Sequence, residues 1–257
     1  MSRKPLVSCL CVSNNRAGYL KKAISYFISQ TYANKELIIV SAKHNREYEK
    51  ILANYATEPI AYYGSQDSTQ ELTLGELRNL AIERSKGEYF CIWDDDDWFH
   101  YRRIEIQMRE VFKYKKEGSI LPFCMMFDSV NQNAYLSNLI LPPGSILCKK
   151  SSITKDLLYP ALNKAEDSYF LNNLFTKNIL YPLINPVLYI YIYHGENTSG
   201  LAHFNKLRGN KLSNEIGLLI NDVVENKYSY EHASRLLGST KVLRELDYFK
   251  NAPATLI

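Results

Sequence analysis

The sequence lacks the features that would assign it at once to a membrane or to nucleic acid. A bilayer-spanning helix needs about 20 consecutive apolar residues, whereas the longest apolar run, residues 181–193, is shorter and contains two prolines. The 31 basic and 27 acidic residues nearly cancel, so the net charge of +4 is too small to indicate a nucleic-acid-binding protein. The N-terminus carries no signal-peptide cleavage pattern. We therefore expect a cytoplasmic protein that does not bind nucleic acid.

Cysteine is also scarce, and its spacing argues against two common uses. The number of cysteines is odd, and none stands in a CxxC pair; they are Cys9, Cys11, Cys91, Cys124 and Cys148. An odd number argues against a disulfide framework, and the missing CxxC pairs argue against a zinc site. Most of them have apolar neighbours, as buried free thiols do. We expect buried free thiols.

Strand-like and helix-like patterns alternate over the first hundred residues. Short, mostly apolar runs typical of buried strands stand at residues 6–13, 36–41, 60–63 and 88–93. Between them, apolar residues recur at helical spacing over residues 19–29, 47–55 and 74–84. This alternation predicts a doubly wound α/β sheet with parallel strands.

The rest of the sequence continues this pattern and then changes to helices. Residues 120–149 contain short apolar runs broken by Asn, Pro and Gly, as expected for strands and loops, and residues 166–177 have a helical apolar stripe. Beyond residue 200, amphipathic helices are predicted. We therefore expect an α/β domain over residues 1–200 and a helical C-terminal extension over residues 201–257, packed against that domain or against a second subunit of a homodimer.

Four consecutive aspartates, Asp94 to Asp97, follow a buried strand in the sequence WDDDDW. Ligands of open parallel sheets bind beyond the carboxyl ends of the strands. Like charges this close repel unless they are solvated or bound to a cation, and carboxylates suit Mg²⁺ or Mn²⁺. Side chains two apart on an extended segment point the same way, so Asp94 and Asp96 are expected to face one ligand. The alternative is a solvated acidic loop ahead of a helix over residues 101–114.

Four motifs stand in a characteristic order along the chain. They are VSCLCVSNNRAGYLKKAISYFISQTYANKELIIV, GELRNLAIERSKGEYFCIWDDDDW, the acidic pair Glu166-Asp167, and YHGENTSG. In this order and spacing they resemble the motifs of the family-2 glycosyltransferases of GT-A fold, over residues 5–200. The resemblance implies a GT-A-like, Rossmann-like nucleotide-binding sheet of mixed strand direction. It also implies transfer of a sugar from a nucleotide-diphosphate sugar, with inversion at the anomeric carbon.

The resemblance also implies roles for the residues that match the motifs. Asp96 matches the aspartate nearest the metal, Mn²⁺ or Mg²⁺, and Asp94 the one nearer the ribose. The other residues expected to bind the nucleotide sugar are Ser13, Asn15, Arg16, Arg78, Asn79 and Asp95. For Arg78 the alternative is an ion pair on the surface of a helix.

Two further residues have a functional and a structural interpretation. Asp167, preceded by Glu166, matches the family's general base, although acidic residues in the first turn of a helix also favour the helix dipole. His194, in YHGENTSG, matches a histidine that contacts the metal or the diphosphate, although a lone histidine is more often a loop residue.

The sequence departs from the family at two positions. Val12 stands where the family usually has proline. Ser41 stands where the second strand usually ends in an aspartate that reads the base. A serine can still hydrogen-bond a base edge, but with less charge assistance. Ser41 is therefore expected in the nucleotide-sugar site, while the nucleobase stays open.

The implied reaction has a carbohydrate or lipid-linked acceptor in bacterial polysaccharide or glycoconjugate synthesis. A metal acts as a Lewis acid on the departing diphosphate, and a carboxylate takes the proton of the acceptor hydroxyl. A lipid-linked acceptor leaves open peripheral contact with the inner face of the membrane. Two alternatives are a sugar nucleotidyltransferase, which usually carries a glycine-rich phosphate loop, and a non-catalytic nucleotide- or carbohydrate-binding protein, for which Ser41 would mark lost activity.

Overall fold

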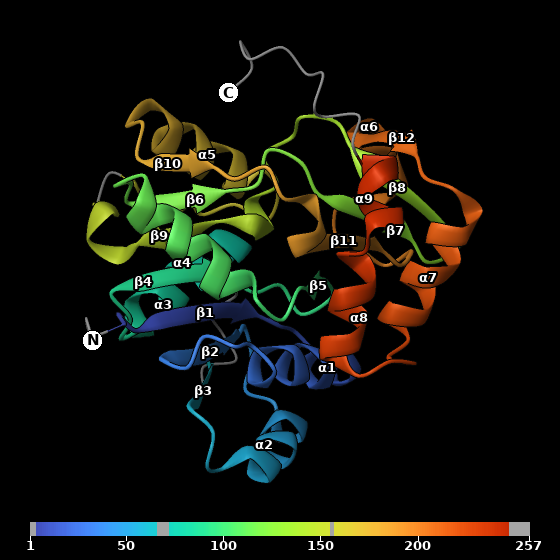
Figure 1. The fold of residues 1–257 in the computed structure, drawn as a ribbon. Coiled ribbons are helices and arrows are strands. Elements are labelled where there is room, and N and C mark those ends of the chain that lie inside the picture. The colour runs from blue at the N-terminus through green and yellow to red at the C-terminus, as the bar shows by residue number, and fades with distance from the viewer. Residues whose placement is uncertain (1–3, 66–71, 155–156, 247–257) are drawn as a thin grey trace.

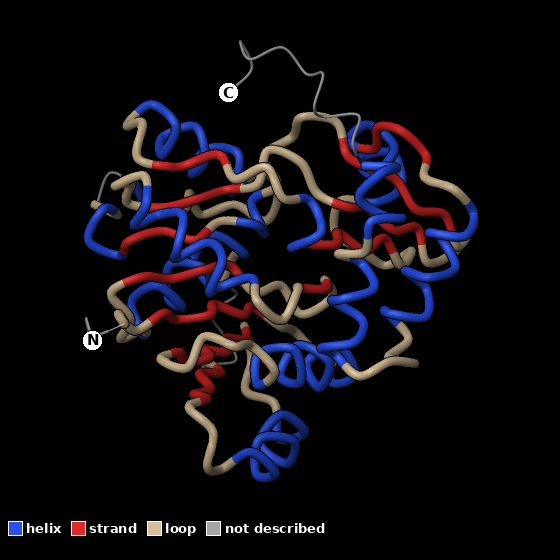
Figure 2. The backbone as a smooth tube through the Cα atoms, in the orientation of Figure 1, coloured by secondary structure: helices blue, strands red, loops and turns tan. Residues whose placement is uncertain are grey.

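The computed structural model describes residues 4–65, 72–154 and 157–246. Two β-sheets lie side by side, with helices packed around them (Figures 1 and 2). One sheet has the strand order β10-β6-β9-β4-β1-β2-β3, and the other has the order β12-β8-β7-β11-β5. The carboxyl end of β4 leads directly into β5, so the aspartate segment lies at the junction between the two sheets.

The seven-stranded sheet has the doubly wound pattern expected from the sequence. Its strands are β1 (Val7–Val12), β2 (Lys35–Ser41), β3 (Ile60–Gly64), β4 (Tyr89–Ile92), β6 (Gly118–Ile120), β9 (Leu147–Lys149) and β10 (Leu180–Pro182). β4, β1, β2 and β3 pair in parallel, whereas β9 runs antiparallel between β4 and β6. The α/β prediction is confirmed, and β9 makes the strand direction mixed.

Helices cover both faces of this sheet because its central strands are apolar on both sides. On β1, Cys9 and Cys11 face one core, and Leu10 and Val12 face the other, as the two-residue period of a strand requires. The first core includes residues of α1 (Ala17–Ile28), α2 (Arg46–Leu52) and α4 (Arg103–Lys113). The second includes residues of α3 (Leu74–Arg84) and α5 (Glu166–Thr176).

The five-stranded sheet continues the first core. Its strands are β5 (Trp98–Phe99), β7 (Met125–Asp128), β8 (Asn133–Ser137), β11 (Tyr189–Tyr193) and β12 (Arg208–Lys211). β11 pairs in parallel with β7 and antiparallel with β5, so it ties the chain around residue 190 to the segment that follows the aspartates. Short 3₁₀ turns connect the strands at η1 (Ala53–Tyr55), η2 (Pro143–Ser145), η3 (Lys150–Ser152) and η5 (Pro186–Leu188).

The described part of the C-terminal extension is helical, as expected, except for β12. Its helices are α6 (Gly200–Leu207), α7 (Asn214–Val224), α8 (Tyr230–Leu237) and α9 (Thr240–Leu246). α7 and α8 lie beside α1 in Figure 1, where the Tyr230 ring stacks on Tyr26 at 5.1 Å between centroids. β12 pairs antiparallel with β8. The extension therefore shares a hydrophobic core with the rest of the chain.

All five cysteines are buried and free, which confirms that expectation. Within residues 4–65, 72–154 and 157–246, no helix has the length and apolarity needed to cross a bilayer.

Candidate active site

The chain turns within the four aspartates that follow β4, so the prediction that they form an extended segment is wrong. Residues 95 and 96 form the turn. Asp94 pairs with Arg78, with Nη1 and Oδ1 3.2 Å apart, whereas Asp96 pairs with Arg16 at 2.6 Å. Arg16 also pairs with Asp95 at 2.6 Å. Asp95 and Asp96 thus share one guanidinium, while Asp94 has a different partner.

The loop after β1 holds this turn from one side. The hydroxyl of Ser13 donates to Asp95 at 2.5 Å and lies 2.7 Å from the hydroxyl of Tyr48. The backbone N–H of Arg16 donates to the same Tyr48 hydroxyl at 2.9 Å. Asn15 adopts a left-handed backbone conformation, with φ of 53°, and its side chain accepts a hydrogen bond from Asn45. Three predicted residues, Ser13, Asn15 and Arg16, are therefore in one loop, and two of them contact the aspartates.

Asp97 bonds to β11 of the second sheet. It is buried, and its carboxylate accepts hydrogen bonds from the Tyr189 hydroxyl at 2.5 Å and from the Ile192 N–H at 3.0 Å. Burial, followed by the charges of Asp96 and Asp94, raises the pKa of Asp97 well above its usual range. Asp97 is therefore suited to joining β4 and β11 and poorly suited to holding a cation.

The environment of Asp96 favours the charged form of its carboxyl. Burial opposes ionisation, but hydrogen bonding by His194 and the charge of Arg16 outweigh it, so the pKa of Asp96 is lowered. Burial and the charge of Asp96 raise the pKa of neighbouring Asp95 to about 7. The negative charge of this pair is therefore concentrated on Asp96.

His194 lies directly after β11 and reaches the same carboxylate. Its Nε2 is 3.2 Å from Asp96 Oδ2, and its ring lies against that of Tyr19, with centroids 4.9 Å apart. His194 and Asp96 line a small cavity of about 80 Å³, which is bounded by α1, β11 and the end of α7. The structure thus brings together the two residues predicted to be near the metal, Asp96 and His194.

The donor set fits a divalent cation only as part of a larger shell. Among the residues that the structure describes, no three His, Cys, Asp or Glu side chains are placed to hold a metal ion by themselves. Mg²⁺ commonly takes one or two carboxylates and completes its shell with water and substrate phosphates. Asp96, with its lowered pKa, fits that role.

The acidic pair lies at the start of α5, beyond Arg78. Glu166 is buried and pairs with Arg78 Nε at 3.2 Å. Burial raises the pKa of Glu166, and the charge of Arg78 opposes that effect. Asp167, the next residue, is only partly buried, and the Ser168 hydroxyl is 3.4 Å from its carboxylate. Asp167 is thus the more accessible of the two carboxylates.

Arg78 and Asn79 are both engaged within the protein. Arg78 lies between Asp94 and Glu166, and Asn79 exchanges two hydrogen bonds with the backbone of Tyr159. The predicted contact of both residues with the nucleotide stays a prediction. The alternative for Arg78, a surface ion pair, does not describe it, since its side chain is only 12% exposed.

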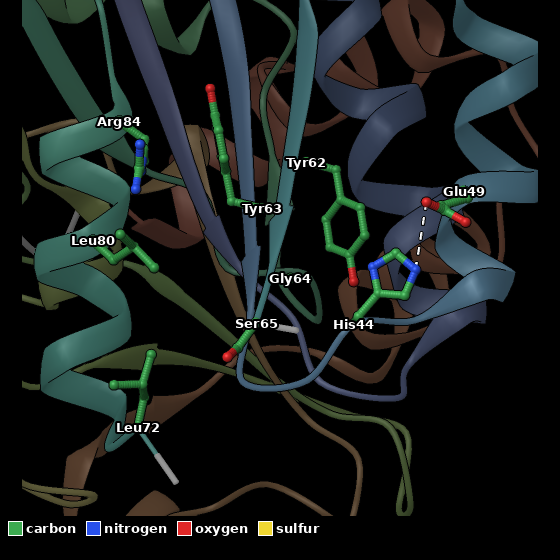
Figure 3. A pocket seen from close by; sticks show the side chains of 9 residues that line it. All are labelled: His44, Glu49, Tyr62, Tyr63, Gly64, Ser65, Leu72, Leu80 and Arg84. Atoms are coloured by element: carbon green, nitrogen blue, oxygen red, sulfur yellow. Dashed lines mark ion pairs between the residues drawn. The ribbon is translucent and has the colours of Figure 1, made fainter. Parts of the chain in front are cut away.

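Ser41 is buried at the end of β2 beside a larger hollow. Its hydroxyl donates to the Lys43 carbonyl at 2.7 Å and lies 2.8 Å from the Tyr62 hydroxyl. Figure 3 shows Tyr62 beside this hollow of about 390 Å³, with His44 and Glu49 on one side of β3 and helix α3 on the other. Sequence reasoning did not single out Tyr62 or Tyr48, because an isolated tyrosine in a chain with 20 of them carries no signal.

The sequence of this chain matches one known family over most of its length. The profile of Glycosyl transferase family 2 matches residues 8–168. An uncharacterized glycosyltransferase of Rickettsia typhi is 28% identical over 159 residues, which cover 62% of this chain and 47% of the relative. Another, from Rickettsia felis, is 31% identical over 119 residues, covering 46% of this chain and 19% of the relative. The chain thus spans less than half the length of these curated relatives.

Solved glycosyltransferases share the fold at low sequence identity. TarS of S. aureus, in complex with UDP-GlcNAc, superposes with a TM-score of 0.60 at 14% identity, covering 95% of this chain and 73% of TarS. The mannosyltransferase PcManGT of Pyrobaculum calidifontis, in complex with GDP-Man and Mn²⁺, gives 0.57 at 11% identity, covering 98% of this chain and 71% of that one. The fold is therefore that of the GT-A glycosyltransferases, and the chain belongs to glycosyl transferase family 2.

Proposed function

We propose that this glycosyltransferase moves a sugar from a nucleoside-diphosphate sugar to an acceptor hydroxyl, with a divalent metal and with inversion at the anomeric carbon. One observation carries the proposal: the turn after β4 brings Arg16 and His194 to Asp96, while Arg78 connects the same turn to the acidic pair of α5. These contacts support a site with groups for the leaving diphosphate on one side and for the acceptor proton on the other.

The donor side is built from Asp96, His194 and Arg16. Asp96, with His194 beside it, would hold a divalent cation, which would supply Lewis-acid stabilisation of the diphosphate. PcManGT, which shares the fold, was solved with Mn²⁺ and GDP-Man, and this supports Mn²⁺ or Mg²⁺ as the cation. Arg16 carries a fixed positive charge beside the two aspartates, and this supports a role for it in binding phosphate oxygens.

The acceptor side is built on Asp167. The acceptor oxygen forms a bond to the anomeric carbon as the bond from that carbon to the diphosphate breaks, and Asp167 takes the hydroxyl proton. Glu166 is less suited to this role because it is buried against Arg78. A carbohydrate or lipid-linked acceptor in bacterial polysaccharide or glycoconjugate synthesis fits the family, and peripheral contact with the membrane would accompany a lipid-linked one.

The nucleobase end of the donor is proposed to lie near Ser41 and Asn15. Tyr62 lines the hollow of Figure 3, and its hydroxyl is hydrogen-bonded to the Ser41 hydroxyl. TarS and PcManGT share the fold; the first was solved with UDP-GlcNAc and the second with GDP-Man. A UDP-sugar and a GDP-sugar are therefore both candidate donors.

The test is incubation of the protein with a panel of UDP-, GDP- and TDP-sugars, with Mn²⁺, Mg²⁺ or EDTA, and with simple sugars or lipid-linked sugars as acceptors. Release of the nucleoside diphosphate that depends on metal and acceptor supports the proposal. Formation of a sugar nucleotide from a nucleoside triphosphate would instead identify a nucleotidyltransferase. Donor binding without any release would identify a non-catalytic binding protein.

A further inference from the structure

We propose that Asn79 and Arg78 of α3 are positioning residues that fix the start of α5, and with it Asp167, relative to the aspartate turn. The proposal rests on the proposed function, since it takes Asp167 as the general base. It assigns to these two residues a role in transfer to the acceptor that is separate from contact with the nucleotide.

The start of α5 is not held by its own sequence. Among the described residues, no side chain caps this helix, and the residue before it, Ala165, has a left-handed backbone with φ of 62°. That conformation is unfavourable for a residue with a Cβ. A helix N-terminus without a side-chain cap is also less stable than one that has a cap. Contacts from outside α5 must therefore fix where it begins.

Asn79 supplies the first of these contacts. Its amide N–H donates to the Tyr159 carbonyl at 2.8 Å, and its amide oxygen accepts from the Tyr159 N–H at 2.9 Å. The side-chain amide of Asn79 thus bonds both the carbonyl and the N–H of Tyr159. This fixes the orientation of Tyr159 as well as its position. The Tyr159 ring in turn stacks on Phe170 of α5, with centroids 4.0 Å apart and an interplanar angle of 15°.

The first turn of α3 supplies further contacts to the same loop. The Gly75 N–H donates to the Leu162 carbonyl at 3.0 Å, and the Leu74 N–H donates to the Asn163 side chain at 3.0 Å. A Cβ on Gly75 would come within 1.8 Å of the Pro160 carbonyl oxygen, so the backbones approach as closely as glycine allows. α3 therefore contacts the loop before α5 along two successive turns.

Arg78 connects the start of α5 to the aspartate segment after β4. Its Nε pairs with Glu166 and its Nη1 with Asp94, each at 3.2 Å, while the guanidinium lies 5.8 Å from the centre of the Tyr159 ring. Glu166 is the neighbour of Asp167 in the first turn of α5. A change in the Arg78–Glu166 pair therefore moves the base with respect to the aspartate segment, residues 94–97.

The consequence is a separation of donor binding from transfer. A misplacement of about 1 Å of a reacting group can reduce the rate about 100-fold, even when the altered residue does not touch the substrate. Loss of the two hydrogen bonds between Asn79 and the Tyr159 backbone is therefore expected to lower kcat by about 10- to 100-fold. The KM for the donor should stay within about threefold of the wild-type value.

The experiment measures kcat and donor KM for Asn79→Ala and for the milder Asn79→Asp, which keeps the acceptor for the Tyr159 N–H and loses the donor. The substrate is whichever donor of the panel supports transfer, and binding of its free nucleoside diphosphate is measured in parallel. Asn54→Ala is the matched control, because Asn54 also donates to backbone carbonyls, those of Lys50 and Ile51 in α2, and α2 and α5 pack in the cores on opposite faces of the sheet. Thermal unfolding of each variant reports whether it folds.

A double-mutant cycle with Asp167→Asn decides between positioning and general destabilisation. If Asn79 acts through Asp167, Asn79→Ala should reduce kcat by less than about threefold in the Asp167→Asn background. Independent, multiplicative losses, a donor KM raised in step with the loss of activity, or an unchanged kcat would each overturn the proposal. An inactive wild-type protein would instead refute the proposed function, so the two failures are distinguishable.

Discussion

His100, between β5 and α4, is expected to make the stability of this fold depend on pH. Its ring is buried, and its Nδ1 accepts a hydrogen bond from the Arg102 N–H at 3.1 Å. Burial, followed by the charge of Arg102, lowers the pKa of His100 from 6.5 to about 4. The folded protein therefore keeps the imidazole neutral at a pH at which the unfolded chain has already bound a proton.

The sign and size of the effect follow from proton uptake. Because the pKa in the folded state lies below that in the unfolded state, lowering the pH through 6.5 favours unfolding until the folded state is protonated near pH 4. At about 1.4 kcal/mol for each pKa unit, the full loss is roughly 3 kcal/mol. Between pH 7.5 and 5.5, the expected loss is about 1.4 kcal/mol of the free energy of unfolding.

The assay is urea unfolding, followed by tryptophan fluorescence, of the wild type and of His100→Asn at pH 7.5, 6.5 and 5.5. Asparagine offers an oxygen to the Arg102 N–H but does not bind a proton in this range. Asp95, whose pKa is raised to about 7, titrates in the opposite sense and contributes equally to both proteins. The difference between the two pH profiles therefore isolates His100.

The variant should lose about 1.4 kcal/mol less than the wild type over this pH interval, whatever its stability at pH 7.5. His203→Asn, at an exposed position of α6, is the control and should follow the wild-type profile. Parallel profiles for the wild type and His100→Asn would refute the reasoning, because burial would then impose no cost on the charged ring.

Four further predictions concern the proposed site and the extension. Asp96→Ala should abolish transfer while the protein stays folded, and full turnover in EDTA would contradict a metal role. Asp167→Asn should lower the rate by about 10²–10⁴-fold with donor affinity unchanged, and Glu166→Gln should be milder; the opposite ranking in steady-state kinetics would make Glu166 the base. Ser41→Asp should change the preference among UDP-, GDP- and TDP-sugars, and an identical donor profile would remove it from the base pocket. The protein, including residues 201–257, should not float with anionic liposomes, and firm, salt-sensitive association would show membrane contact instead.

The fold could be predicted in outline because its signals are local in the sequence. Buried strands such as residues 7–12 are continuous apolar runs, and α1 places Leu20, Ala23, Ile24 and Phe27 on one face, so period and length identify each without tertiary information. β12 could not be predicted in this way. Its sequence, RGNK, has no apolar alternation, and it becomes a strand only because it pairs with β8.

The residue types of the site could also be predicted, but not their partners. The four aspartates after β4 were visible as a motif, whereas the turn at residues 95–96 makes Asp95, rather than Asp94, share Arg16 with Asp96. A run of identical side chains contains no sequence signal that distinguishes its members. Their different burial and neighbours separate them, and this is why the pKa of Asp96 falls while that of Asp97 rises.

The sequence by itself determined which segments become strands and helices, and which charged residues follow the strand ends, because hydrophobic period and motif spacing are properties of adjacent residues. Only the tertiary structure decided that Arg78 stands between Asp94 and Glu166, which are 72 positions apart in the chain. The same holds for Asn79, which exchanges two hydrogen bonds with the backbone 80 positions further on. Such contacts depend on how α3 and α5 pack on one face of the sheet, and the geometry of that packing is set by the whole core.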